Sequence, residues 1–401
     1  MNSTVRLGDV LSERRERVKV APDGVYPMAG VYGFGRGILV RDAVLGANIA
    51  ASHLYRIEQD QIVYSRLKAF EGAFALVTSE AHGRFVSNEF PSFDVDSTAA
   101  DPRFLALILQ TPATWAEMSE LITGMGSRRE RLKVDDFLSF EFGLPSLGEQ
   151  QSIVGATSVL RQLLAAANAE LSQAGDLYRA GLERSVSVLV DTVVPLSEVV
   201  RKLASGRSPR CEDRPPTPDE WAVLKVSSVR QLSFEPAAAK ALPRTETPFA
   251  TAEVRPGDLL TIRASGSARL VGAFCIADAP PPRLLMSDYH WRVEVDDERV
   301  DPRYLMHVMG SQLARDQLEL AIVGSTTAAK LSKGRLLEVE VPIPALDIQR
   351  RIADRLDAIQ ALMQASTREV EALQALRPAL ATKLLSGGPP ASDLSAVPSM
   401  S

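Results

Sequence analysis

Asp-Pro-Arg-Phe-Leu at residues 101–105 returns as Asp-Pro-Arg-Tyr-Leu at residues 301–305, 200 residues further along the chain. Neither composition nor a local structural preference explains a five-residue match at this separation. Self-similarity within one chain is the sequence signature of a repeated structural unit. The match therefore predicts that one unit occurs twice in a chain of 401 residues, which is longer than one ordinary hydrophobic core needs.

Three further motifs occur in the same order in both halves. They are Val5-x-Leu7-x-x-Val10 with Val194-x-Leu196-x-x-Val199, Gly126-Ser127 with Gly324-Ser325, and Pro145-x-Leu147-x-x-Gln150-x-x-Ile153 with Pro344-x-Leu346-x-x-Gln349-x-x-Ile352. The matches run from the beginning of each half to its end. The whole unit, and not one short motif, is therefore expected to be duplicated.

Each unit is predicted to be α+β. Strand-like segments such as residues 61–65 and 258–262 come first. The Asp-Pro pair then opens a helix, because aspartate can cap it and proline at the first helical position loses no hydrogen bond. We expect these helices at residues 104 to about 121 and 304 to about 321. A polar loop and a strand ending at Leu144-Pro145 or Val341-Pro342 follow.

A long helical pattern comes next in both halves. Apolar or small residues recur in alternating steps of three and four, as in a coiled-coil seam. The first seam is Ile153, Ala156, Leu160, Leu163, Ala167, Leu171, Ala174 and Tyr178, and the second is Ile352, Leu356, Ile359, Met363, Ser366, Val370 and Leu373. Each helix would run for roughly 35 residues, or about 50 Å. Pro378 is expected to kink or end the second helix.

Two arrangements of these helices are open: antiparallel pairing with each other, or packing of each on its own unit. Two matched long seams favour pairing, with polar residues such as Gln360 and Glu371 off the seam. The predicted segments are then a domain at 1–145, a helix at 146–190, a second domain at 191–343, a second helix at 344–385 and a tail at 386–401. The tail is rich in Ser, Gly, Pro and Ala, which predicts disorder.

Composition restricts the class of protein. The net charge of −5 argues against a protein that coats nucleic acid by bulk electrostatics, so any DNA contact must be local. Cys211 and Cys275 form no CxxC motif, which fits a reducing compartment, the cytoplasm. No apolar run approaches a membrane span, and charged residues at 13–17 replace the apolar core of a signal peptide.

Catalytic motifs are not found in the sequence. The four histidines, at 53, 82, 290 and 307, form no HxxxH or HxH pair, so surface or core roles are favoured over a metal site. The glycine-rich stretch at residues 30–37 lacks the Gly-Lys-Ser/Thr of a P-loop and is predicted to be a turn. No Asn/Asp-Pro-Pro-aromatic tetrapeptide, expected in a chain that methylates adenine itself, occurs. We therefore predict a protein without catalytic activity of its own.

Polar, basic loops recur at the same places in both halves with different residues. Arg and Lys suit phosphates and guanine edges, and Ser and Thr hydroxyls suit either, so these loops are candidates for a shared DNA-binding edge. The alternative is that each charge run is only a solvated surface. The candidates are Ser65, Arg66, Lys68, Ser127, Arg128, Arg129, Arg131 and Lys133 in the first half, and Arg263, Ser265, Ser267, Arg269, Thr326, Thr327, Lys330 and Lys333 in the second.

Taken together, the chain from Leu7 to about Leu385 resembles the specificity subunits of type I restriction-modification systems. The motifs that carry the resemblance are Tyr26-Pro27-Met28-Ala29-Gly30, Tyr64-Ser65-Arg66-Leu67, Ser87-Asn88-Glu89, Pro256-Gly257-Asp258-Leu259-Leu260, Gly324-Ser325 and, the most specific, Pro145-Ser146-Leu147-Gly148-Glu149-Gln150.

The resemblance implies two target-recognition domains, each reading one half of a split site in double-stranded DNA, separated by two antiparallel helices. It also implies docking of two modification subunits, which bind S-adenosylmethionine and methylate adenine, and recruitment of ATP-driven restriction subunits. Glu149, Gln150 and Gln349 are the partner-binding candidates, although Ile348 stands where the first copy has Glu149. This chain itself would hold no cofactor.

Other classes of function remain open at this stage. The chain could be the target-recognition component of another modification or defence system, or a fragment whose partner is a nuclease. It could also be a pairing scaffold whose loops bind protein. A DNA reader that contacts several phosphates loses affinity steeply as salt rises, whereas a protein-binding scaffold shows no such slope for duplex DNA.

Overall fold

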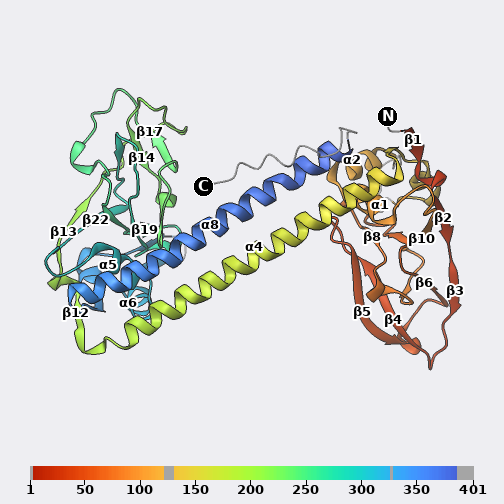
Figure 1. The fold of residues 1–401 in the computed structure, drawn as a ribbon, viewed down its shortest axis with the longest axis horizontal. Helices are drawn as coiled ribbons and strands as arrows, with labels where there is room; N and C mark the ends of the chain where they lie inside the picture. Colours follow the sequence, from red (N-terminus) through yellow and green to blue (C-terminus); the bar gives the residue numbers. More distant parts are fainter. Residues whose placement is uncertain (1–2, 122–130, 326–327, 386–401) are drawn as a thin grey trace. The chain divides into compact units, whose positions relative to one another are not determined.

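The computed structural model describes residues 3–121, 131–325 and 328–385 (Figure 1). The chain divides into two compact units, one holding the residues up to Ala166 with the end of the last helix from Glu371, and the other holding Ala167–Val370. Each unit contains one β-rich domain and part of both long helices. The predicted tail at 386–401 lies outside the described residues.

The first domain is built on an antiparallel sheet of β2 (Leu11–Arg14), β10 (Ser92–Val95), β7 (Ile62–Tyr64) and β8 (Phe74–Leu76), in that order. A second sheet has the order β3 (Glu16–Lys19), β6 (His53–Arg56), β9 (Phe85–Val86), β4 (Val25–Val31) and β5 (Ile38–Leu45). β1 (Ser3–Arg6) pairs with β11 (Glu141–Leu144). The helices are α1 (Pro102–Leu109), α2 (Pro112–Leu121) and α3 (Val134–Ser139).

The second domain repeats this core. Its antiparallel sheet has the order β13 (Val200–Ser205), β22 (His290–Val295), β18 (Leu259–Ile262) and β20 (Phe274–Ile276). β12 (Val193–Pro195) pairs with β25 (Glu340–Pro342). The helices are α5 (Pro302–Val308), α6 (Gln312–Ala321) and α7 (Lys333–Leu337). The strands outside the shared core are β14 (Ala222–Leu224), β15 (Val229–Arg230), β16 (Ser233–Phe234), β17 (Ala239–Ala241), β19 (Ala264–Ser265), β21 (Leu284–Leu285), β23 (Val323–Ser325) and β24 (Ala328–Lys330).

The duplication predicted from the sequence is confirmed at the level of single hydrogen bonds. The Leu7 N–H donates to Phe140 O, and the Leu196 N–H donates to Val339 O, both at 2.9 Å. Asp101 and Asp301 cap α1 and α5 by accepting the N–H of the residue two positions on, at 2.8 and 2.9 Å. The α+β class with two repeated domains and two long helices is therefore confirmed.

One predicted helix in each half is in fact two. In the first domain α1 ends at Leu109 and α2 begins at Pro112. Proline lacks the N–H that would continue the helix, and it disfavours the helical conformation of Thr111 before it. In the second domain Ser311 starts α6 by accepting the Ala314 N–H on its side chain. Both breaks therefore lie at residues whose local chemistry favours the start of a new helix.

The long helices exceed the roughly 35 residues estimated from the seams and lie within the predicted segments 146–190 and 344–385. α4 spans Leu147–Ser187, 41 residues, and α8 spans Leu346–Leu385, 40 residues. α8 continues through Pro378, so of the two predicted outcomes, a kink or an end of the helix, the end is contradicted. Leu163 is 48% exposed, so its place on the seam was also wrong. The other seam positions are at least half-buried.

The two helices pack together inside the second unit, where they run in opposite directions (Figure 1). Tyr178 and Leu182 of α4 share a hydrophobic core with Ala353 and Leu356 of α8. The Tyr178 hydroxyl lies 2.8 Å from His307 Nδ1, and His307 Nε2 lies 2.8 Å from Asp357 Oδ1. This buried polar chain joins α4, α5 and α8.

Candidate nucleic-acid interface

In the first domain the two predicted basic segments lie next to each other. The Leu132 N–H donates to Arg66 O at 3.0 Å, and the Arg66 N–H donates to Glu89 O at 2.9 Å. Arg131 Nη2 lies 3.1 Å from Glu89 Oε1. The loop that carries Ser65, Arg66 and Lys68 is thereby joined to the segment that carries Arg131 and Lys133.

The second domain joins the corresponding segments in the same way. The Leu331 N–H donates to Arg263 O at 2.8 Å, and the Arg263 N–H donates to Tyr289 O at 2.9 Å. β19 continues from this point and pairs with β24, which pairs with β23. The two candidate segments of this half, around Arg263 and Lys330, therefore form one small sheet.

Arg66 and Arg263 occupy equivalent positions and share an unusual feature. The Nε atom of each is buried and has no hydrogen-bond partner among the residues that the structure describes. Arg263 also lies over the Trp291 ring, 5.9 Å from its centroid, and donates from Nη1 to Asp288 O at 3.3 Å. Buried donors without partners are rare in folded proteins, and here one recurs at the same place in both domains.

The remaining candidates differ in how free their side chains are. Lys68 Nζ lies 3.6 Å from Glu71 Oε2, and Lys333 Nζ donates to Leu203 O at 2.6 Å. Ser65 and Ser265 are buried, while Ser267 is exposed. Three exposed cations form no ion pair within the described ranges: Lys133, Arg269 and Lys330.

Five candidates fall outside the described residues, so their predicted positions are not tested. They are Ser127, Arg128, Arg129, Thr326 and Thr327.

Gln150 and Gln349, the two glutamines predicted to bind a partner, are 0% exposed. Gln150 accepts the Asp101 N–H at 2.8 Å and donates to Ala99 O and Pro145 O at 3.0 and 2.9 Å. Gln349 makes the equivalent bonds with Asp301, Arg299 and Pro344 at 3.0, 2.8 and 2.7 Å. Each side-chain amide thus fastens the start of a long helix to its domain. A direct partner contact would need exposed side chains.

Glu149 is exposed and caps its own helix. Its Oε2 accepts the Ser146 N–H at 2.9 Å and the Ser146 hydroxyl at 2.7 Å. These hydrogen bonds lower the pKa of the Glu149 carboxyl. The second copy has Ala345 and Ile348 at the two positions, so both members of the pair are replaced together. The sequence difference at Ile348 is therefore explained by local capping.

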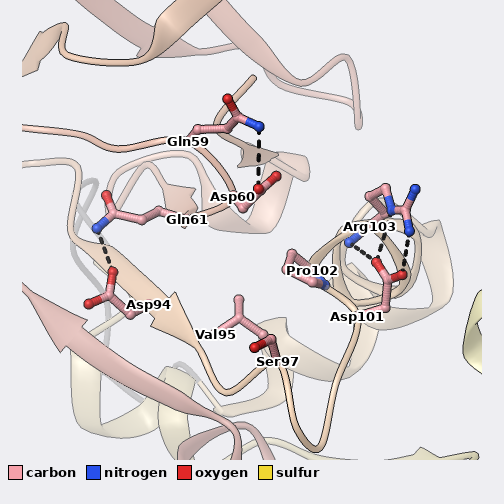
Figure 2. Close-up of a pocket in the computed structure, with 9 residues that line it drawn as sticks. All are labelled: Gln59, Asp60, Gln61, Asp94, Val95, Ser97, Asp101, Pro102 and Arg103. Carbon is pink, nitrogen blue, oxygen red and sulfur yellow. Dashed lines mark hydrogen bonds and ion pairs between the residues drawn. The ribbon is translucent and has the colours of Figure 1, made fainter. Parts of the chain in front are cut away.

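An acidic pocket that the sequence did not predict lies in the first domain (Figure 2). Asp60, Asp94 and Asp101 line it with Gln61 and Arg103. Gln61 Nε2 donates to Asp94 Oδ1 at 2.7 Å, and Arg103 Nη2 lies 2.7 Å from Asp101 Oδ2. Carboxylates repel phosphates, and none of the predicted DNA-binding residues lines this pocket, so it is not part of the candidate interface.

Two kinds of site were searched for in the described part of the chain. No group of three or more His, Cys, Asp or Glu side chains there is arranged to hold a metal ion. No helix among the described residues is long and apolar enough to cross a bilayer.

The fold defines a class of protein: a duplicated α+β protein with two long helices, in which the same polar and basic segments are joined in each domain. Residues 245–372 match the model of the family described as type I restriction modification DNA specificity domain. This match confirms the resemblance that was inferred from the sequence.

Two curated relatives match parts of the chain. The specificity subunit of the type I restriction enzyme EcoEI of Escherichia coli is 26% identical over 164 residues, covering 40% of this chain and 27% of the relative. The MjaVIII specificity subunit of Methanocaldococcus jannaschii is 26% identical over 90 residues, covering 22% and 21%. The matched stretches thus span about a quarter of the length of these relatives.

Solved structures match nearly the whole chain. The S subunit of a type I restriction-modification system from M. genitalium has a TM-score of 0.59 at 14% identity, covering 96% of both chains. A chain from a type I R-M system described for its complex assembly and conformational transition has a TM-score of 0.54 at 18% identity, covering 96% of this chain and 97% of its own. At these identities the likeness establishes the fold.

Proposed function

We propose that this chain is the DNA-reading subunit of a type I restriction-modification complex, with each domain reading one half of a split target. The observation that carries the proposal is that the candidate basic segments are joined in the same way in both domains; we call these joined segments the edge of each domain. In both domains one backbone hydrogen bond joins a basic loop to the segment before α3 or α7, and a second one joins the same loop to Glu89 or Tyr289. The side chains on the two edges differ, as two readers of different half-sites require.

Different residues of each edge suit contacts with phosphates and contacts with bases. Exposed Lys133, Arg269 and Lys330 can contact phosphates, which contributes affinity without sequence information. Arg66 and Arg263 lie more deeply and are held by their backbones, so they are better suited to a fixed contact with a base edge. A bidentate arginine contact with guanine is worth about 1–3 kcal/mol of discrimination.

The reaction itself would belong to partners. We propose two modification subunits that bind S-adenosylmethionine and methylate adenine, and ATP-driven restriction subunits where these are present. The polar surfaces of α4 and α8 are the proposed docking region, with Glu149 at its margin. Gln150 and Gln349 are left out of this contact because their amides are bonded inside the chain. The proposed domain limits are 1–145 and 191–343, and the proposed compartment is the cytoplasm.

The experiment purifies the chain with its neighbouring methyltransferase and maps methylated adenines across a genome. We expect one bipartite motif with a fixed gap. A triple variant that replaces Arg128, Arg129 and Arg131 should relax one half of the motif. A second triple variant that replaces Thr326, Thr327 and Lys330 should relax the other half. Arg6→Ala, at an exposed arginine on β1, is the control and should leave both halves intact.

Two results would contradict the proposal. If both triple variants relax the same half, the domains do not divide the site. If the purified chain alone methylates DNA with S-adenosylmethionine and no second protein, the chain is a catalyst and not only a reader.

A further inference from the structure

The glycine-rich turn between β4 and β5 presents an exposed aromatic ring in a strained conformation. Phe34 has a φ of 61° and is 67% exposed. A side chain at positive φ crowds the backbone, which is why glycine usually occupies such positions. Leu232 also has a positive φ, 65°, but it packs against the core of its domain. Packing of its own ring therefore does not explain why Phe34 is held in this conformation.

The backbone of this turn is fastened to the loop after β7. The Phe34 N–H donates to Glu71 O at 2.6 Å, and the Gly35 N–H donates to Gly72 O at 3.0 Å. Across the turn, the Tyr32 N–H donates to Gly37 O at 2.9 Å. The turn is thus fixed by three backbone hydrogen bonds while the Phe34 ring faces solvent.

Two glycines allow the turn and the loop to lie close to the end of α1 and to α2. A Cβ atom on Gly35 would lie 2.9 Å from Gln110 O, and one on Gly72 would lie 2.2 Å from the Trp115 ring. Trp115 is itself fixed, because its Nε1 donates to Leu109 O at 2.8 Å. The turn therefore rests on a rigid support, and Phe34 is presented in one place.

The turn and the loop bonded to it carry apolar and charged residues. Phe70, 45% exposed, precedes the residue that binds the Phe34 N–H, and Lys68 lies on the same loop. Arg36 stacks on the Tyr32 ring, 4.6 Å from its centroid. The negative charge of Glu71 is balanced by Lys68. This loop is also the one that carries Arg66, so the turn adjoins the candidate edge of the first domain.

We propose that Phe34, with Phe70 on the adjoining loop and Arg36 on the same turn, is an apolar wedge that contacts the bases of the first half-site. Aromatic side chains pack against bases or between base steps, and adjacent cations neutralise the phosphates on either side. The proposal rests on the proposed function and adds one base-contacting element to it. The described residues between β13 and β18 fold into β14, β15, β16 and β17 in sheets of another order, so the second half-site is read without this wedge.

Phe34→Gly separates a DNA contact from a structural role. Glycine adopts a positive φ without strain, so the thermal stability of the protein should stay the same or rise. If the Phe34 ring had a structural role, its removal would instead lower the stability. The complex with the neighbouring methyltransferase is titrated onto duplexes that carry the motif mapped for the unchanged protein. We expect binding to weaken at least about fivefold, the lower end for one lost base contact. Val25→Ala, an exposed apolar residue on β4 outside the turn, is the control.

The position of the loss is decisive. The weakening should disappear when the first half-site is scrambled, and it should persist when the second is scrambled. Unchanged affinity, an equal loss on unrelated DNA, or lost assembly with the methyltransferase would each overturn the wedge, the last in favour of a protein contact. If the unchanged complex methylates no bipartite motif, the proposed function fails, whatever Phe34→Gly does.

Discussion

Phe90 and His290 stand at the same position in the two domains, and only one of them can take a proton. The Phe90 N–H donates to Ser87 O at 3.0 Å, and the His290 N–H donates to Ser287 O at 3.1 Å. The His290 side chain is 0% exposed, and its Nδ1 lies 2.8 Å from the Ser287 hydroxyl. Burial lowers the pKa of His290 to about 4.

This buried histidine predicts a loss of stability in mild acid. Below the ordinary histidine pKa of about 6.5 the unfolded chain binds a proton that the folded domain refuses until about pH 4. The free energy of unfolding should therefore fall as the pH falls through this window, by about 2 kcal/mol between pH 7 and pH 5. His290→Phe, which installs the residue of the first domain, should remove this part of the pH dependence.

The measurement is urea unfolding at the two pH values, with hydrogen exchange of β18 and β22 to report on the second domain. Carboxylates also titrate in this range, so the difference between the two proteins isolates the histidine. An equal fall in both proteins would show that His290 is protonated in the folded domain.

Gln150 shows how far single residues could be interpreted from the sequence. Its recurrence as Gln349 identified a residue that both copies need, but recurrence does not show what a side chain contacts. The structure gives it three backbone partners, at Asp101, Ala99 and Pro145. Asp101 was predicted to cap α1 because its role is local, whereas the role of Gln150 depends on a segment about fifty residues away.

Gln150→Met should therefore destabilise the first domain selectively. The change keeps the shape but leaves one buried N–H and two buried carbonyls without partners, at a cost of about 1–3 kcal/mol for each unsatisfied group. Hydrogen exchange should show faster opening at α1 and the start of α4, with the second domain unchanged. Gln349→Met is the matched variant and should reverse the pattern. Loss of methyltransferase binding with unchanged exchange would instead favour a partner contact.

At the scale of elements, the sequence predicted where the long helices lie along the chain better than it predicted which face of each helix is buried. The seam on α4 was placed through Leu163, but Leu164 is the half-buried residue and Leu163 faces solvent. Steps of four then three and of three then four both connect Leu160 to Ala167. Because Leu163 and Leu164 are adjacent, the pattern allows either of them as the seam residue, and only the packing of the helix shows which one is buried.

The starts of the two long helices differ in capping. Removing the serine from the first start and adding one to the second should therefore change stability in opposite directions. Ser146 and Glu149 form a capping pair on α4, whereas α8 has Ala345 at its cap position. Ser146→Ala should lower the stability of the first domain by about 1 kcal/mol, and Ala345→Ser should raise that of the second by a smaller amount. Thermal unfolding of the two variants against the unchanged protein measures both. A loss from Ala345→Ser would show that the α8 start has no free cap to fill.

At the scale of the whole molecule, the duplication was predictable and the differences between the copies were not. The shared core follows from motifs such as the Asp-Pro pair, whose local chemistry is the same in each half. The outer strands differ: the first domain has a five-stranded sheet, and the second has two sheets of three strands and one of two. Short segments with Gly and Pro between them gave no periodicity long enough to assign these strands. The candidate segment of the second domain includes two of these strands, β19 and β24, and from the sequence it was placed only by its position in the repeat.

The paired helices lead to a prediction about the gap between the half-sites. Inside the second unit a Cβ on Gly181 of α4 would lie 3.6 Å from Leu356 of α8. The opposite helix directions then set the stretch from Ala167 to Ala174 against the stretch from Met363 to Val370. Duplicating residues 168–174 and 364–370 together adds one heptad to each helix and keeps the seam in register.

If these helices set the unread gap, the doubly extended protein should read the same two half-sites with a wider gap. Seven residues add about 10 Å at 1.5 Å each, which corresponds to about three base pairs at 3.4 Å per pair. Rotation of the DNA helix over three base pairs opposes this change, so we also expect slower methylation. Mapping of methylated adenines gives the gap directly. Extending only α4 is the control, because it misplaces the seam and should reduce assembly. An unchanged gap in a doubly extended and active complex would show that the spacing is set outside α4 and α8.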